Sequence, residues 1–345
     1  MSLLEIKGLE TEFQTEQGVV KALRGINYTV DRGEVLGIVG ESGSGKSVGM
    51  LSLMGLLAPN GTVTAGEMIF DGEDISPIKY KTKKEKKEYE KKMNQIRGND
   101  ISMIFQDPMS YLNPIVTIEK QMTEGIRFHT KCSKKEAVQR AVELMKMVGI
   151  PAPESRLKQY PFEFSGGMRQ RIIIAIALAC NPKLIVADEP TTALDVTVQA
   201  QILDLLKDIT KESNAGVIII THDLGVVASL CDRISIMYGG NIMEEGTTDE
   251  IFYDPKHPYT KGLLNSIANS NVDHREPLKP IPGTPPDLLK LGDQCPFASR
   301  CSEAMEICTK ASPLVTEFGE THKCKCWLHC KERWHEVLKG EDAYE

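Results

Sequence analysis

The stretch Gly40–Ser47 reads GESGSGKS, which fits the pattern G-x-x-x-x-G-K-S. It follows the apolar run Val35–Val39, which predicts a strand, and it precedes an apolar segment after Lys46 that predicts a helix. Glycines at this spacing allow a tight turn whose backbone N–H groups point at phosphate oxygens. The helix that follows directs the positive end of its dipole at the same anion. The stretch therefore predicts a phosphate-binding loop between a strand and a helix.

The residues of this loop have distinct expected roles. Lys46 can neutralise charge on the β- and γ-phosphates of a nucleotide, and Ser47 can ligate Mg²⁺. The other loop residues predicted to bind ATP are Gly40, Ser42, Gly43, Ser44 and Gly45.

A pair of carboxylates follows a second apolar run, Leu184–Ala187, which reads as a buried parallel strand. Asp188 can hold Mg²⁺ through water, and Glu189 can act as a general base on the attacking water. Many structural strands also end in acids. The phosphate loop upstream favours the catalytic interpretation.

Two further polar residues each follow an apolar strand-like run. Gln106 comes after Ile101–Phe105, and His222 comes after Val217–Thr221. In open α/β sheets, ligands lie at the carboxyl ends of the strands, so both side chains are candidates to reach the γ-phosphate or its metal. The helical stretch Val198–Glu212 separates two of the predicted strands, and this alternation predicts an α/β fold.

Composition limits the possible classes of protein. The chain has 345 residues, 41% of them hydrophobic, and a formal net charge of −7, which disfavours non-specific binding of nucleic acid. No apolar run is long enough to span a bilayer, and no signal peptide is visible, so we expect a cytoplasmic chain. The lysine-rich run Lys79–Lys92 predicts a solvated helix of mixed charge.

The segment Ser165–Gln170 reads SGGMRQ at the start of a predicted helix, and it completes a set of motifs. In its order along the chain, this set resembles the ATPase subunits of ABC transporters. The motifs are Gly40–Ser47, Gln106, Ser165–Gln170, Leu184–Glu189, Ala193–Asp195 and His222.

The resemblance implies a P-loop ABC-type nucleotide-binding domain. Such a domain has a RecA-like parallel sheet core, an antiparallel β subdomain and a helical subdomain. We place this domain at residues 1–270, with the helical subdomain at about 107–180, and a small cysteine-rich extension at 271–345.

The resemblance also implies roles for single residues. Lys46, Glu189 and His222 would be catalytic in Mg²⁺-dependent ATP hydrolysis, with Ser47, Gln106 and Asp188 serving the metal. Asp195 would cross the contact between two ATPase subunits. Phe13 would stack on adenine, with Tyr28 as the alternative, although either aromatic could equally be a core residue. The residues that would contact ATP held by the opposite subunit are Ser165, Gly166, Gly167 and Gln170.

The region after the ATPase motifs narrows the class. His257–Ser266 (HPYTKGLLNS) and Ile281–Cys301 resemble the C-terminal region of oligopeptide and dipeptide uptake ATPases, in particular the D-type subunit. This implies two permeases, a second ATPase subunit in a heterodimer, an external substrate-binding protein, and a peripheral location on the cytoplasmic face of the membrane. Nickel or oligosaccharide import, and a non-transport ABC ATPase, are the alternatives.

Six of the nine cysteines lie in the tail, and in a cytoplasmic chain such clustering favours metal over disulfides. The spacing resembles a family pattern that implies a [4Fe–4S] cluster on four thiolates, with zinc as the alternative. Free thiols or an air-oxidised disulfide are a third interpretation. The expected ligands are Cys295, Cys301, Cys308 and Cys326, with Cys324 or Cys330 as an alternative fourth ligand.

Overall fold

The structure is a computed structural model, and it describes residues 2–105, 111–191, 196–266, 280–330 and 334. The chain divides into two compact units. The first comprises residues 1–4, 29–36 and 69–221, and the second comprises residues 5–28, 37–68 and 222–345. The predicted domain boundary near residue 270 lies outside the described residues.

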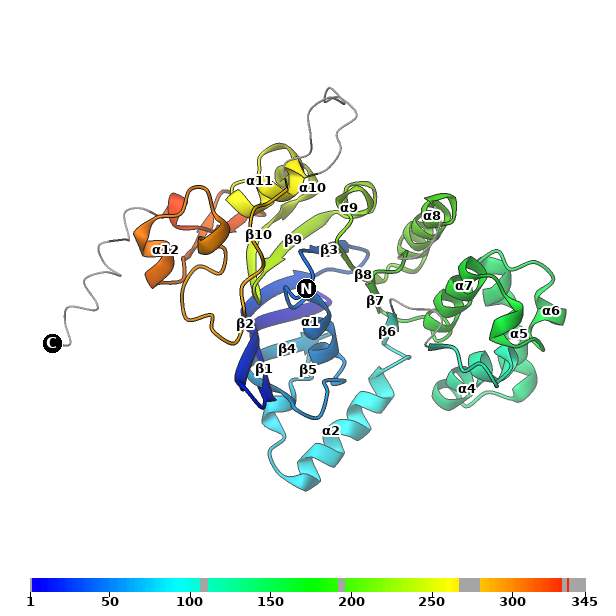
Figure 1. Ribbon diagram of the computed structural model, residues 1–345. Helices are drawn as coiled ribbons and strands as arrows, with labels where there is room; N and C mark the ends of the chain where they lie inside the picture. Colours follow the sequence, from blue (N-terminus) through cyan, green and yellow to red (C-terminus); the bar gives the residue numbers. More distant parts are fainter. Residues whose placement is uncertain (1, 106–110, 192–195, 267–279, 331–333, 335–345) are drawn as a thin grey trace. The chain divides into compact units, whose positions relative to one another are not determined.

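The first unit contains a parallel β-layer and a group of helices (Figure 1). Strand β7 lies between β6 and β8 and runs parallel to both, as predicted from the apolar runs. The elements of this unit are β5 (Glu73–Asp74), α2 (Lys83–Ile96), β6 (Ile101–Ile104), α4 (Ile118–Thr130), α5 (Lys134–Met147), α6 (Pro153–Arg156), α7 (Gly166–Ala177), β7 (Leu184–Asp188), α8 (Val196–Ser213) and β8 (Gly216–Thr221).

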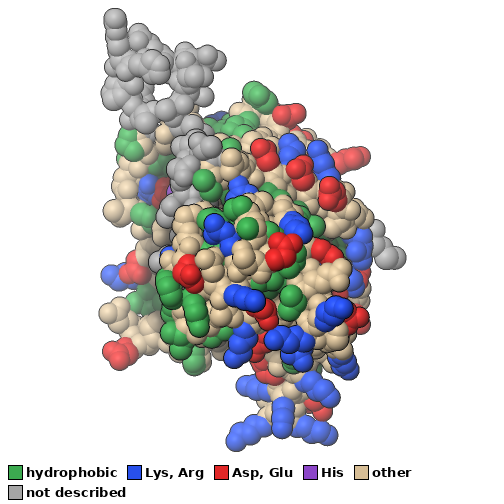
Figure 2. All heavy atoms as spheres, turned by 90° about the vertical axis from the view of Figure 1, so that its right-hand side faces the viewer, with side chains coloured by type: hydrophobic (Ala, Val, Ile, Leu, Met, Phe, Trp, Pro, Cys, Tyr) green, Lys and Arg blue, Asp and Glu red, His purple; other side chains and the backbone are tan. Residues whose placement is uncertain are grey.

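Local sequence explains how helices in this unit begin and which face they bury. Ser133 caps α5, since its hydroxyl accepts the N–H of Glu136 while the Glu136 carboxylate accepts the N–H of Ser133. Ala137, Ala141, Leu144 and Met145 recur at helical spacing and are buried, and α5 packs on α4 and α7. The predicted helix of mixed charge is α2, whose lysines are largely exposed. Figure 2 shows basic side chains gathered at the lower end of the view, where Figure 1 places α2.

The second unit is mainly antiparallel. A two-residue turn joins β1 to β2, and β1 lies between β2 and β4. A second set of strands has the order β11-β12-β10-β9-β3, with antiparallel pairing from β11 to β9. The elements that lie wholly or mostly in this unit are β1 (Leu4–Thr15), β2 (Gly18–Val30), β3 (Val35–Val39), α1 (Lys46–Leu53), β4 (Gly61–Phe70), α9 (Leu224–Leu230), β9 (Arg233–Tyr238), β10 (Asn241–Thr247), α10 (Thr248–Tyr253), α11 (Pro258–Asn265), α12 (Glu306–Lys310), β11 (Val315–Glu317) and β12 (Lys323–Lys325).

The cysteine-rich extension joins the second unit through β12, which pairs with β10. The buried carboxylate of Glu244 reinforces this pairing. It accepts the backbone N–H groups of Lys256 at 2.6 Å and His257 at 2.9 Å, and it lies 2.8 Å from Nε2 of His322. One carboxylate therefore ties β10 to the chain entering α11 and to the chain entering β12. Within the described residues, no helix has both the length and the apolar composition needed to cross a membrane.

Glu244→Ala should destabilise the second unit strongly, because it removes a buried acceptor from three donors at once. Breaking a buried charged network in this way costs about 3–5 kcal/mol, which predicts a loss of roughly 6 °C or more in Tm. The matched control is Glu317→Ala, which removes an exposed ion pair with Lys323 and should change stability by less than about 1 kcal/mol. Thermal unfolding followed by circular dichroism measures both. Equal Tm values for the two variants would contradict the assigned role of Glu244.

Candidate nucleotide-binding site

The phosphate loop predicted from Gly40–Ser47 connects β3 to α1 in the second unit, as the sequence indicates. Two of its glycines are required by the backbone. A Cβ on Gly40 would lie 2.1 Å from the backbone oxygen of Met237, which no side chain tolerates. Gly45 is the N-cap of α1 with a φ of 103°, a left-handed conformation that favours glycine. The loop can therefore lie this close to β9 only because these positions lack side chains.

Lys46 is buried and fixed within the loop. Its Nζ donates to the backbone oxygens of Gly40 at 2.7 Å and Glu41 at 2.9 Å. Ser42, Gly43 and Ser47 are exposed at the surface of the same loop. A glycine-rich turn, a fixed ammonium group and the N-terminus of α1 together fit the terminal phosphates of a nucleotide. The exposed hydroxyl of Ser47 is suited to ligate the Mg²⁺ that accompanies such a nucleotide.

The predicted acidic pair lies at the end of β7 in the first unit. Asp188 is the last residue of the strand and is buried, whereas Glu189 is half-buried. The backbone of Glu189 adopts a φ of 46°, which is uncommon for a residue other than glycine. Its N–H donates to the backbone oxygen of Ile220 at 2.8 Å, so β8 holds it there. Strain of this kind, held by the surrounding structure, is typical of functional residues.

The segment Ser165–Gln170 forms the start of α7 in the first unit. Ser165 caps the helix by accepting the N–H of Met168, and the N-terminus of α7 provides a positive dipole end. Gln170 is buried, and its Nε2 donates to the backbone oxygen of Pro190 at 2.7 Å. Because Pro190 follows Glu189, this hydrogen bond ties α7 directly to the acidic strand end.

The remaining predicted site residues differ in their surroundings. His222 is exposed in the second unit, just before Asp223, which caps α9. Phe13 is half-buried on β1, where its ring lies against Gly61. Tyr28 is fully buried, and burial raises the pKa of its phenol, so it is a core residue and leaves Phe13 as the candidate adenine platform. Gln106 and Asp195 lie outside the described residues.

The prediction of an iron–sulfur cluster is wrong. The structure describes all six tail cysteines, yet its described residues contain no group of three or more Cys, His, Asp or Glu side chains that could hold a metal ion. The nine cysteines are free thiols. Burial raises the pKa of Cys295 and of Cys326 to about 12, so both thiols are protonated when no metal is bound.

The cysteines expected as ligands instead contribute to the interior of the extension. Cys301 is half-buried, and the others are buried: Cys295, Cys308 and Cys326, together with the alternatives Cys324 and Cys330.

Sequence reasoning missed three residues around the phosphate loop. The hydroxyl of Tyr259 accepts the N–H of Glu41 at 3.0 Å, and the carboxylate of Glu41 pairs with the Arg300 guanidinium at 2.6 Å. Tyr259 belongs to the HPYT motif that begins at His257, but separations of 218 and 259 residues leave no local pattern that predicts either contact.

Comparison with known proteins agrees with this geometry. The family model described as "ABC transporter" matches residues 23–192, and one described as "Oligopeptide/dipeptide transporter, C-terminal region" matches residues 243–308. The Oligopeptide transport ATP-binding protein OppD of Bacillus subtilis is 53% identical over 94% of this chain and 88% of its own length. The Dipeptide transport ATP-binding protein DppD of the same organism is 48% identical over 98% of both chains.

A solved structure supports the same fold. The dimeric ATP-binding cassette MJ0796, bound to ADP and Pi in a post-hydrolysis state, is 29% identical with a TM-score of 0.61. The match covers 71% of this chain and 98% of that one.

These matches place the chain in a class of ATP-hydrolysing proteins that use Mg²⁺ and act with membrane permeases. It belongs to the ABC transporter family, in the group of oligopeptide and dipeptide transport ATP-binding proteins.

Gly40→Ala should impair use of ATP, because the loop must move by about 1 Å to bring the new Cβ to a tolerable distance from Met237. A misplacement of this size costs roughly 100-fold in kcat/KM. Gly49→Ala is the control. Gly49 lies in α1, and its new Cβ would lie 3.8 Å from the Ile26 side chain, which is an ordinary van der Waals distance. Steady-state ATPase kinetics separate the two variants. A kcat/KM equal to that of the parent in Gly40→Ala would show that the close approach of the loop to Met237 does not matter for catalysis.

Gln170→Leu should lower kcat about tenfold, because it leaves the buried Pro190 carbonyl without its donor and frees the backbone beside Glu189. ATP affinity should change by less than about twofold, since the phosphate loop is untouched. The control is Arg171→Gln, on the same helix, whose guanidinium donates to Val148 and Gln201 instead. Measuring kcat and ATP binding on the transporter assembled with its membrane subunits tests this. A loss of affinity with unchanged kcat would refute the positioning role of Gln170.

Proposed function

We propose that this chain is the ATP-hydrolysing subunit of an importer for oligopeptides or dipeptides. Two relatives that span nearly its whole length are named as oligopeptide and dipeptide transport proteins, and this observation carries the proposal. The C-terminal region of this group matches residues 243–308, which include Tyr259 and Arg300 beside the phosphate loop. We propose residues 1–270 as the ATPase domain, with a helical subdomain at about 107–180, and 271–345 as its extension.

The proposed chemistry assigns one task to each group. Lys46 and the amides of Gly40–Ser47 hold the terminal phosphates and stabilise the charge that develops on them. Glu189 orients and deprotonates the attacking water, and His222 contacts the γ-phosphate. Bound Mg²⁺ neutralises phosphate charge. The residues proposed to hold it are Ser47, Gln106 and Asp188, while Phe13 stacks on adenine.

We propose that the working unit contains two ATPase subunits, the second being a homologous chain. The start of α7, with Ser165, Gly166 and Gly167 exposed or half-buried, is suited to meet the phosphates of ATP held by the partner. Gln170 supports this helix from inside, and Asp195 lies in the segment assigned to the subunit contact. The dimeric state described for the similar cassette supports this arrangement.

The first unit exposes large apolar side chains that we propose as a surface for membrane partners. It exposes large apolar side chains in the stretch 111–162, among them Ile115, exposed by 82%, and Phe162, exposed by 66%. Figure 2 shows hydrophobic side chains exposed among charged ones on one face of the protein. Exposed apolar side chains mark protein interaction sites where they form a contiguous patch. We propose that two permeases bind there, that the chain is peripheral on the cytoplasmic face, and that an external binding protein delivers the substrate.

Uptake of labelled di- and oligopeptides tests the proposed substrate class. Cells that carry only Glu189→Gln in place of the parent chain should lose ATP-driven uptake by at least about 100-fold, because the general base is gone while ATP binding remains. The matched control is Glu143→Gln, which makes the same chemical change at an exposed carboxylate on α5 of the same unit. Uptake by this control should match the parent.

The alternatives are distinguished in the same cells. If Glu189→Gln loses nickel or oligosaccharide uptake while peptide uptake stays intact, the assignment of peptides as substrate is wrong. The assignment of the chain as an ATPase would still hold. Unchanged uptake of all three substrates would contradict a role in import.

A further inference from the structure

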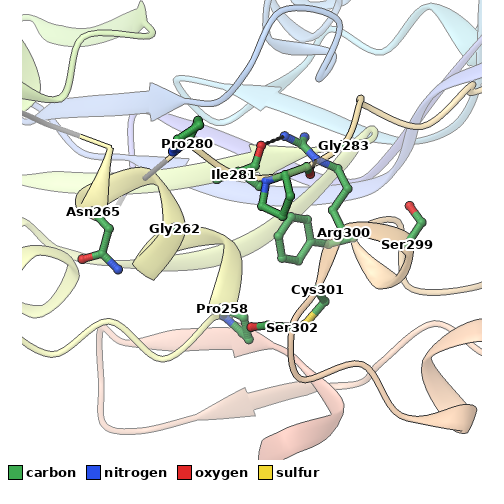
Figure 3. Close-up of a pocket in the computed structure, with 12 residues that line it drawn as sticks. Pro258, Gly262, Asn265, Pro280, Ile281, Gly283, Ser299, Arg300, Cys301 and Ser302 are labelled. Atoms are coloured by element: carbon green, nitrogen blue, oxygen red, sulfur yellow. Dashed lines mark hydrogen bonds between the residues drawn. The ribbon is translucent and has the colours of Figure 1, made fainter. Parts of the chain in front are cut away.

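Arg300 of the cysteine-rich extension reaches the phosphate loop. It lies in the short 3₁₀ turn Ala298–Arg300, and its side chain is only 5% exposed. One guanidinium nitrogen, Nη1, donates to the Glu41 carboxylate at 2.6 Å and to the Tyr238 hydroxyl at 3.1 Å. Nε and Nη2 donate to the backbone oxygens of Pro282 at 2.9 Å and Ile281 at 3.2 Å, as Figure 3 shows for the side chain beside Ile281. The guanidinium is therefore fixed from several sides.

Glu41, the second residue of the phosphate loop, is held at three of its polar groups. Its N–H donates to the Tyr259 hydroxyl, its backbone oxygen accepts Nζ of Lys46 at 2.9 Å, and its carboxylate pairs with Arg300. One residue thus connects the extension to the lysine that is assigned to the phosphates. A displacement of Glu41 would also displace an acceptor of that lysine.

The charge of Glu41 creates an electrostatic problem. A carboxylate within a loop that binds a polyanion repels that anion unless a cation neutralises it. Arg300 is the cation paired with it in the structure. Burial lowers the pKa of Arg300, but the hydrogen bonds with Glu41 and Tyr238 outweigh this effect and raise it, so the guanidinium remains charged.

We propose that Arg300 is a positioning residue of the ATPase, through which the C-terminal extension sets the affinity for ATP. It neutralises the carboxylate of Glu41 and holds the loop segment that fixes Lys46. This inference rests on the ATPase activity alone and is independent of the transported substrate.

The surroundings of Arg300 make it suitable for substitution. It borders a pocket of about 540 Å³ between α11, the segment Pro280–Gly283 and the turn that carries Arg300 (Figure 3). A shorter side chain enlarges this existing pocket rather than creating a sealed cavity in a packed core, which is the costlier outcome.

A double-mutant cycle on the full-length chain tests the proposal. The variants are Arg300→Gln, Glu41→Gln and both together, each in a Glu189→Gln background that prevents hydrolysis during titration with Mg·ATP. Arg300→Gln should weaken ATP binding about tenfold, because it leaves the Glu41 carboxylate unpaired. Adding Glu41→Gln should restore most of the affinity by removing that charge. Arg300→Lys should keep more affinity than Arg300→Gln.

The control is Arg24→Gln. Arg24 also joins the extension, since it donates to the backbone oxygens of Leu291 at 2.6 Å and Gly292 at 3.1 Å, but these contacts do not involve Glu41 or Lys46. The ATP affinity of the Arg24→Gln variant should stay within about twofold of that of the parent chain.

Two results would overturn the proposal: parent-like affinity in Arg300→Gln, or failure of the second substitution to restore affinity. Failure to restore affinity would show that Arg300 supports the fold of the loop but does not act by neutralising the Glu41 carboxylate. If Arg300→Gln does not fold, Arg300→Met, alone and together with Glu41→Gln, decides in the same way, because methionine also removes the cation. Peptide uptake is not measured, so the outcome is separate from that of the transport assignment.

Discussion

The rest of the site depends on the hydrogen bonds that fix the ammonium group of Lys46 within the phosphate loop. The backbone oxygens of Gly40 and Glu41 accept these hydrogen bonds and hold the ammonium group inside the loop. This arrangement requires a glycine at position 40, because the loop passes too close to Met237 for any side chain. The charge and the amides around it are thus held in place before phosphate binds, and such preorganised groups give the most effective electrostatic stabilisation.

The second unit surrounds this loop with residues from distant parts of the chain. Tyr238, Tyr259 and Phe297 form an aromatic cluster with ring centroids 4.5–5.3 Å apart, and Arg300 extends from it to Glu41. The neighbouring His257 is buried, which lowers its pKa to about 3 and keeps the imidazole neutral. Its Nδ1 accepts the N–H of Tyr259 and so caps α11. The HPYT motif thereby has a structural role, because it places a hydroxyl beside the loop.

Sequence alone predicted the features that depend on neighbouring residues. The strand before the loop and the parallel strands around Leu184–Asp188 follow from local apolar patterns. The contact between Glu41 and Arg300 could not be predicted, since it joins residues 259 positions apart through the packing of the extension. The iron–sulfur prediction failed for a related reason. Spacing shows which thiols are near in sequence, but the packing of the extension decides which of them meet in space, and the described residues contain no group of three that could hold a metal ion.

If the loop binds the terminal phosphates of a nucleotide, affinity depends on how many phosphates the nucleotide carries. Equilibrium titration of the purified chain with ATP, ADP and AMP in the presence of Mg²⁺ measures this dependence. We expect saturable binding of ATP and ADP at one nucleotide per chain, with much weaker binding of AMP, which lacks the phosphates that the loop would hold. Equal affinity for all three nucleotides, or no saturable binding, would contradict it.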